Sequence, residues 1–133
     1  MKTLVLSAIL VLSFNVFGHE GHGPEQKMAP HGGVLKDGKA LMGELVQDAA
    51  GVKVYLLTHD SKAISPKDVK IDVKAVQLTD AKKKNVSIEV VSEQDALLLK
   101  FDKTSSYRFN LTVPVSYGNA QDKLSWQFEP QAN

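Results

Sequence analysis

Three of the four histidines lie near the N-terminus, in the segments Gly18-His-Glu-Gly-His-Gly-Pro24 and Pro30-His-Gly-Gly33. Histidine is the commonest metal ligand because its neutral ring presents a nitrogen lone pair near physiological pH. Nitrogen donors of this kind suit copper(II), nickel and zinc. The spacing of His19, His22 and His31 therefore predicts a copper or zinc site. The alternative is a polar, Gly-rich tail whose histidines have no function, because this composition is also typical of disordered segments.

These histidines begin where an export signal is expected to end. Lys2 precedes an apolar run over residues 4–17, and Gly18 is a small residue of the kind that signal peptidases recognise. The alternative is a membrane anchor, but the run is shorter than the roughly twenty residues of a membrane-spanning helix. We therefore expect residues 1–18 to be cleaved, residues 19–32 to form a flexible leader, and residues 33–133 to form one soluble periplasmic domain with no stable membrane insertion.

Cleavage after Gly18 would give His19 a free amine, which can chelate a metal ion together with its own imidazole. His22 would then be the fourth residue of the mature chain, so the square-planar chelate that uses a third-position histidine is not expected. The sequence instead predicts a looser site formed by His19, Glu20 and His22.

His31 is the histidine with the most restricted surroundings, because two glycines follow it and allow a tight turn or a close approach to another element. Glu44 is expected on the following strand, where it shares a face with Met42. Met28 offers a thioether sulfur that favours copper(I). His59 lies in a predicted hairpin turn and can contribute only if the fold brings that turn to the N-terminus. Met28, Glu44 and His59 are thus auxiliary candidate ligands, and the alternative for each is a packed or solvated side chain.

Apolar and polar residues alternate through most of the remaining chain, which is typical of half-buried β-strands. With no convincing helical stretch, this pattern predicts an all-β fold, an immunoglobulin-like antiparallel β-sandwich of about seven strands. Pro114 cannot donate to a sheet, so its strand is expected at an edge or with a bulge. Trp126 and Phe128 are expected in the core. The strands are expected at residues 39–47, 52–58, 69–78 with a bulge near Ala75, 86–91, 96–101, 107–116 and 124–128.

The composition argues against several classes of function. The chain has 16 Lys and Arg and 15 Asp and Glu, so removal of Lys2 with the signal leaves 15 of each and gives no reason to expect nucleic-acid binding. It has no cysteine for a disulfide or a lipid anchor. No nucleophile elbow, phosphate-binding loop or zinc-protease helix is present. We expect no enzymatic activity, and oxidative copper chemistry at an N-terminal histidine is the alternative.

Five segments, in order, are similar to a known family: Pro30-His-Gly-Gly-Val-Leu35, Glu44-Leu45-Val46, Val52-Lys-Val-Tyr-Leu56, Ser65-Pro66 and Leu124-Ser-Trp-Gln-Phe128. They resemble the small N-terminal β domain of periplasmic adaptor subunits in heavy-metal RND efflux systems of the cobalt-zinc-cadmium and copper-silver types, and short exported proteins built on that domain. The resemblance implies His31 and Glu44 as site residues and a heavy-metal efflux complex as partner.

An adaptor also needs a helical hairpin, a lipoyl-like domain and a membrane-proximal barrel, which these 133 residues do not contain. We therefore expect a free-standing periplasmic buffer or chaperone for copper or zinc. The alternative is a non-catalytic module that docks on an envelope protein, with an incidental histidine-containing tail. Fold-level similarity alone does not decide between these functions.

Overall fold

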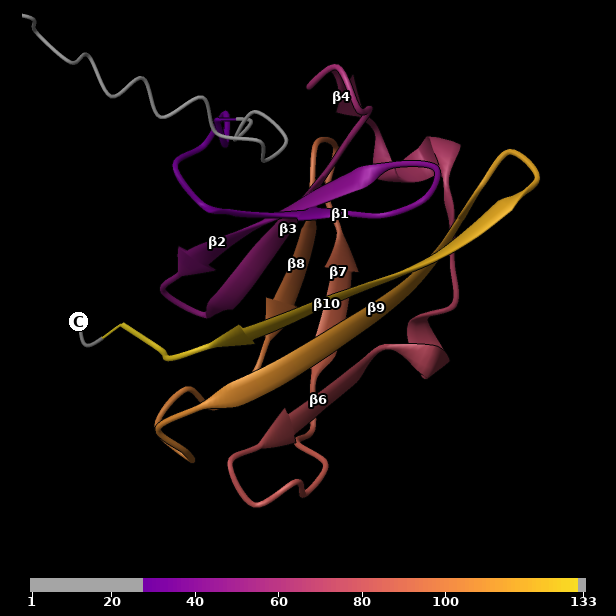
Figure 1. The fold of residues 1–133 in the computed structure, drawn as a ribbon. Helices are drawn as coiled ribbons and strands as arrows, with labels where there is room; N and C mark the ends of the chain where they lie inside the picture. Colours follow the sequence, from indigo (N-terminus) through magenta and orange to yellow (C-terminus); the bar gives the residue numbers. More distant parts are fainter. Residues whose placement is uncertain (1–27, 132–133) are drawn as a thin grey trace, which may run out of the picture.

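The computed structural model describes residues 28–131, which form ten β-strands and two short 3-10 helices (Figure 1). The predicted signal peptide and most of the predicted leader, including His19 and His22, lie outside the described residues. Neither helix within residues 28–131 has the length or apolar character needed to cross a membrane.

The first sheet has six strands, all paired antiparallel. Its main order is β1-β2-β3-β8-β7, and β4 pairs with the end of β3. Residues 49 and 50 form the tight connection between β2 and β3, whose seven residue pairs run from Met42↔Leu57 to Asp48↔Gly51. The strand bounds are β1 Val34–Asp37, β2 Met42–Asp48, β3 Gly51–Leu57, β4 Ala63–Ile64, β7 Glu89–Ser92 and β8 Leu97–Lys100.

The second sheet has four strands and is built around a long hairpin. β9 pairs with β10 over nine residue pairs, and the other edge of β9 pairs with β5 and with β6. In Figure 1 this hairpin runs obliquely across the strands of the first sheet. The bounds are β5 Lys70–Ile71, β6 Gln77–Asp80, β9 Phe109–Tyr117 and β10 Ala120–Phe128, with 3-10 helices η1 at Pro66–Asp68 and η2 at Val73–Ala75.

The core lies between the two sheets and receives apolar side chains from both. Leu45 and Val54 enter it from the first sheet, and Leu111 and Leu124 enter it from the second. Alternation places every second side chain of a strand on this inner face, which is the pattern of a sandwich. The predicted all-β sandwich is confirmed, and its immunoglobulin-like subtype stays a prediction. Trp126 and Phe128 are buried core residues, as predicted.

The strand prediction was incomplete in three places. β1 and β4 were not expected, because both are short and β1 buries little of its surface. The segment 69–78 was expected as one bulged strand, but η2 divides it into β5 and β6. Asp72 caps η2 by accepting a hydrogen bond from the Lys74 backbone N–H, 3.1 Å away. Val73 is therefore 52% exposed rather than part of the buried face.

The expectation that Pro114 lies on an edge strand was wrong. β9 is not an edge strand, because it pairs with β10 on one side and with β5 and β6 on the other. Pro114 lies opposite Lys123 of β10, but on the other side it falls between Val115, the last partner of β5, and Thr112, the first partner of β6. The missing N–H is tolerated because η2 interrupts the neighbouring strand at this level.

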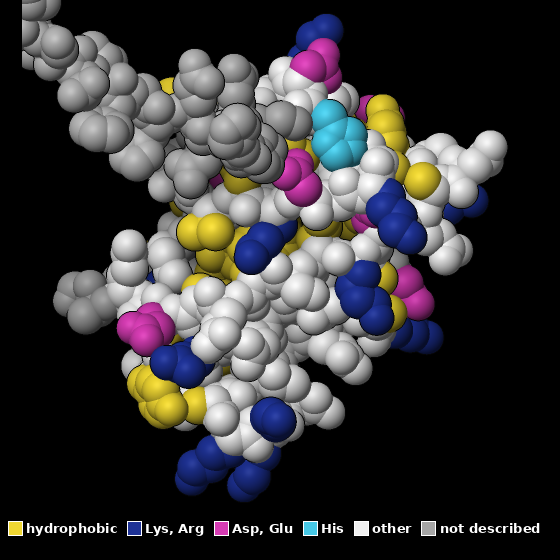
Figure 2. All heavy atoms as spheres, viewed as in Figure 1, with side chains coloured by type: hydrophobic (Ala, Val, Ile, Leu, Met, Phe, Trp, Pro, Cys, Tyr) yellow, Lys and Arg dark blue, Asp and Glu magenta, His cyan; other side chains and the backbone are white. Residues whose placement is uncertain are grey.

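Charged side chains are dispersed over one face of the described part of the molecule. On the face in Figure 2, Lys and Arg side chains of the described residues extend from one end of the molecule to the other, with Asp and Glu among them. The expectation that nucleic acid is not a partner stays a prediction.

Candidate functional site

Glu44 and Tyr55 are positioned by the β2–β3 hairpin, where they are direct cross-strand partners. Residues paired in this way point to the same face of the sheet. Their neighbours Leu45 and Val54 point into the core, so Glu44 and Tyr55 point to the outer face. Glu44 is nevertheless completely buried, with 0% of its surface exposed. A buried carboxylate needs hydrogen-bond donors around it.

The turn that contains His31 supplies these donors. The backbone N–H groups of His31 and Gly33 both donate to Glu44 Oε1, at 2.8 and 2.9 Å. The ring nitrogen His31 Nδ1 lies 2.8 Å from Glu44 Oε2. Two backbone hydrogen bonds and one side-chain contact thus join the end of the predicted leader to the sandwich.

Both glycines of the His-Gly-Gly segment are needed for this geometry. Gly32 has a φ of +73°, in the left-handed region that favours glycine. Gly33 lies so close to β2 that an added Cβ would meet the Leu45 carbonyl oxygen at 2.2 Å. The turn can therefore reach Glu44 only with small residues at these two positions.

The His31 ring is held on a second side by Tyr55. The two rings are stacked, with centroids 3.7 Å apart and an angle of 10° between their planes. The His31 side chain keeps 39% of its surface exposed. Among the residues that the structure describes, none hydrogen-bonds to His31 Nε2, whereas Nδ1 faces Glu44. Within the described residues, one nitrogen of this imidazole therefore makes no hydrogen bond.

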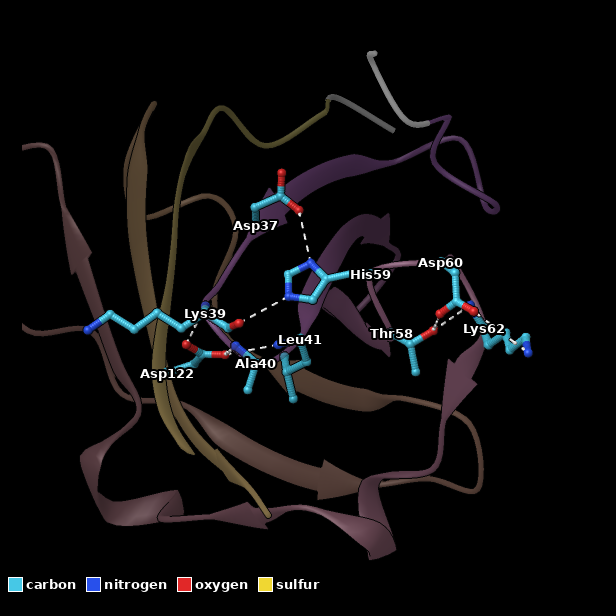
Figure 3. A network of polar contacts seen from close by, with 9 residues as sticks. All are labelled: Asp37, Lys39, Ala40, Leu41, Thr58, His59, Asp60, Lys62 and Asp122. Atoms are coloured by element: carbon cyan, nitrogen blue, oxygen red, sulfur yellow. Dashed lines mark hydrogen bonds and ion pairs between the residues drawn. The ribbon is translucent and has the colours of Figure 1, made fainter. Parts of the chain in front are cut away.

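The other described candidate ligands are not assembled around His31. Met28 is 89% exposed. His59 lies beyond the end of β3, in the turn that follows Leu57. Figure 3 shows it at the β1–β2 turn, with Nε2 3.2 Å from the Lys39 carbonyl oxygen and Nδ1 3.9 Å from Asp37. Within residues 28–131, no group of three or more His, Cys, Asp and Glu side chains could hold a metal ion.

Sequence analysis missed a second buried carboxylate, Asp122 on β10. It accepts hydrogen bonds from three consecutive backbone N–H groups at the β1–β2 turn, those of Lys39 at 2.6 Å, Ala40 at 2.8 Å and Leu41 at 3.1 Å (Figure 3). The signal was present in the sequence, because Asp122 is in phase with the inward-facing residues Leu124, Trp126 and Phe128.

The pKa of Asp122 reflects these contacts. Burial by itself raises the pKa of this carboxyl group, but the three backbone hydrogen bonds and the nearby His59 outweigh that effect and hold the pKa below its ordinary value. The packing is close, because a Cβ added at Gly38 would lie 2.6 Å from Asp122 Oδ2. Asp122 therefore connects the second sheet to the turn between β1 and β2.

A surface pocket of about 880 Å³ adjoins Asp122 rather than His31. It is open and lined by side chains of both charges, among them Lys39, Lys70, Asp72 and Lys123. Asp122 also lines it, but its oxygens already accept three hydrogen bonds from the backbone. The Asp122 carboxylate is therefore engaged by the turn rather than directed to a ligand in the pocket.

Fold and site define a two-sheet β-sandwich that carries an imidazole on the outer face of its first sheet, hydrogen-bonded to a buried carboxylate. Comparison with models of known protein families, with curated proteins and with solved structures finds no match.

Proposed function

We propose that this protein is an exported periplasmic metal-binding protein, a buffer or chaperone for copper or zinc, in which His31 is the anchored ligand. The observation that supports this most strongly is the His31–Glu44 contact of 2.8 Å, which engages Nδ1 and leaves Nε2 without a hydrogen bond among residues 28–131. Metal-binding histidines almost always donate their other ring N–H to a carboxylate, a carbonyl or a water.

One imidazole does not complete a copper or zinc site, since zinc takes about four ligands in most proteins. The remaining donors would come from the segment that precedes the described residues, which contains His19, Glu20 and His22. After cleavage at Gly18 it would also supply the amine of His19. In this proposal Met28 and His59 have at most an auxiliary role.

The heavy-metal efflux complex remains the proposed recipient of the metal ion, and it is supported by the sequence resemblance around His31 and Glu44. A periplasmic carrier benefits from a site with some donors on a folded domain and others on a leader, because ligands can then be exchanged one at a time. A resident cofactor for catalysis is not part of the proposal.

Calorimetric titration of the exported protein with copper or zinc at neutral pH tests the proposal. We expect one tight site, weakened strongly by His31→Ala and lost when His19, His22 and His31 are all replaced by alanine. His59→Ala is the matched control, because the His59 and His31 side chains are similarly exposed, at 45% and 39%. Binding that survives the triple replacement would disprove the assignment.

The first residue of the exported protein is a separate check on the amine ligand. N-terminal sequencing should give His19. Any other first residue removes the proposed chelate between the His19 amine and its imidazole, and leaves the His31 proposal to be judged by the titration alone.

A further inference from the structure

The hydrogen bonds of Glu44 restrict the chemical state of the His31 ring. Glu44 Oε1 faces two backbone N–H groups, which can only donate, so this oxygen must accept both hydrogen bonds. Glu44 Oε2 faces His31 Nδ1, which can be either donor or acceptor. An ionised carboxylate has no proton of its own to donate, so with Glu44 ionised Nδ1 must be the donor in this contact.

We propose that Glu44 is a positioning residue and not a metal ligand: it holds the His31 ring with its proton on Nδ1, so that Nε2 carries the lone pair and is the atom that binds the metal ion. This inference rests on the proposed function for its metal, but the arrangement of the ring exists without metal. The distinction changes the role suggested by the sequence, which offered Glu44 as a possible ligand itself.

The burial of Glu44 supports a role in positioning His31 rather than in direct contact with the metal ion. With no exposed surface and both oxygens engaged by the turn, Glu44 could reach a metal ion only by giving up hydrogen bonds to His31 and Gly33. The Tyr55 ring, stacked 3.7 Å from that of His31, fixes the plane in which Nε2 points away from Glu44. Two contacts thus define both the tautomer and the direction of the free nitrogen.

Glu44→Gln is the informative variant, because glutamine nearly preserves the shape of glutamate. Its carbonyl oxygen can replace Oε1 and accept from both backbone N–H groups. Its NH₂ group then takes the place of Oε2 and faces His31 Nδ1 as a donor. Nδ1 must become the acceptor, so the ring proton moves to Nε2 and covers the metal-binding atom.

The test is long-range ¹H–¹⁵N NMR of the metal-free protein at mildly alkaline pH, which distinguishes the two ring nitrogens. We expect the Nδ1–H tautomer for His31 in the wild type and the Nε2–H tautomer in Glu44→Gln. His59 should be unchanged and serves as an internal reference. An Nε2–H tautomer in the wild type would overturn the inference, even if the variant failed to fold. A tautomer unchanged in folded Glu44→Gln would overturn it as well.

Zinc titration of the same two samples separates this inference from the proposed function. We expect Glu44→Gln to weaken zinc binding by roughly 10–100-fold, the usual effect of losing a partner of a metal-binding histidine. Equal zinc affinity in both proteins would show that Glu44 does not act through His31. If the tautomers change as expected but the wild type binds neither zinc nor copper, the positioning role of Glu44 stands for the metal-free ring and the metal-binding proposal is wrong.

Discussion

Glu44 and Asp122 are two buried carboxylates that do similar work at different places in the sandwich. Each extends from a strand and accepts hydrogen bonds from a neighbouring turn that contains glycine. All three partners of Asp122 are backbone N–H groups. Glu44 has two backbone partners, and its third is the ring of His31. Because of this difference, the contacts of Asp122 are structural, whereas the contact of Glu44 with His31 can affect ligand binding.

The comparison shows how the surroundings of a carboxylate limit its use. The hydrogen bonds of Asp122 end on the backbone of one turn, and they stabilise that turn. The contact from Glu44 to Nδ1 continues through the imidazole to Nε2, on a side chain that keeps 39% of its surface exposed. Through the His31 ring, the buried Glu44 can thus influence the second ring nitrogen.

The largest expected effect is on the stability of Asp122→Ala. This change removes the acceptor of three N–H groups in a turn between two paired strands, and we expect a loss of about 3 kcal/mol in the free energy of unfolding. Glu44→Ala should lose less, about 1.5 kcal/mol, because residues 31–33 precede the first strand and can detach locally. Urea denaturation measures both. A larger loss for Glu44→Ala would contradict this ranking.

The amide variants sharpen the comparison. In Asp122→Asn an NH₂ group must face at least one backbone N–H, so we expect a loss of about 1–3 kcal/mol. In Glu44→Gln the NH₂ group can face His31 Nδ1, which can accept, and the loss should stay below about 1 kcal/mol. Thermal or urea unfolding of the matched pair gives the two values. Similar losses in the two variants would mean that the His31 ring does not change its tautomer to accept a hydrogen bond from the glutamine NH₂ group.

The free energy of unfolding at acidic pH should depend on Asp122. Because folding lowers the pKa of Asp122 from its ordinary value of about 3.9, the folded state binds this proton less readily than the unfolded state. The stabilisation is therefore present above that ordinary value and is lost as the pH falls through the lowered pKa. Unfolding measured between neutral and acidic pH should be less pH-dependent in Asp122→Asn. An unchanged profile would show that other carboxyl groups dominate.

A modest effect is expected for Tyr55. Replacing it with leucine removes the stack on His31 but keeps an apolar side chain on the strand, and we expect a loss of about 0.5–1.5 kcal/mol. The Nδ1–H tautomer should persist, because Glu44 remains. Urea denaturation measures the loss of stability, and long-range ¹H–¹⁵N NMR of the variant reports the His31 tautomer. A change of tautomer in Tyr55→Leu would assign to Tyr55 the role that we give to Glu44.

The sequence predicted the sandwich because its long strands alternate clearly, above all β9 and β10. It did not predict β1, whose residues are mostly exposed and therefore have no apolar period. It also misplaced Pro114, because a proline can lie inside a sheet when the neighbouring strand is interrupted at the same level. That interruption depends on η2, which the alternation of apolar residues does not reveal.

The candidate site was predictable in part. The His-Gly-Gly segment indicated a tight turn, and the phase of β2 placed Glu44 on one face with Met42. The contact between Glu44 and His31 joins residues 13 positions apart and depends on how the turn packs against β2, so local spacing does not reveal it. The stacking on Tyr55 likewise follows from the pairing of β2 with β3.

The most direct test of the central claim is the ¹⁵N signal of His31 Nε2 during addition of zinc to the exported protein. The account predicts that this signal changes in step with the zinc added, up to one ion per protein, while Nδ1 keeps its proton. Zinc binding that leaves Nε2 of His31 unchanged, or that removes the proton from Nδ1, would contradict it.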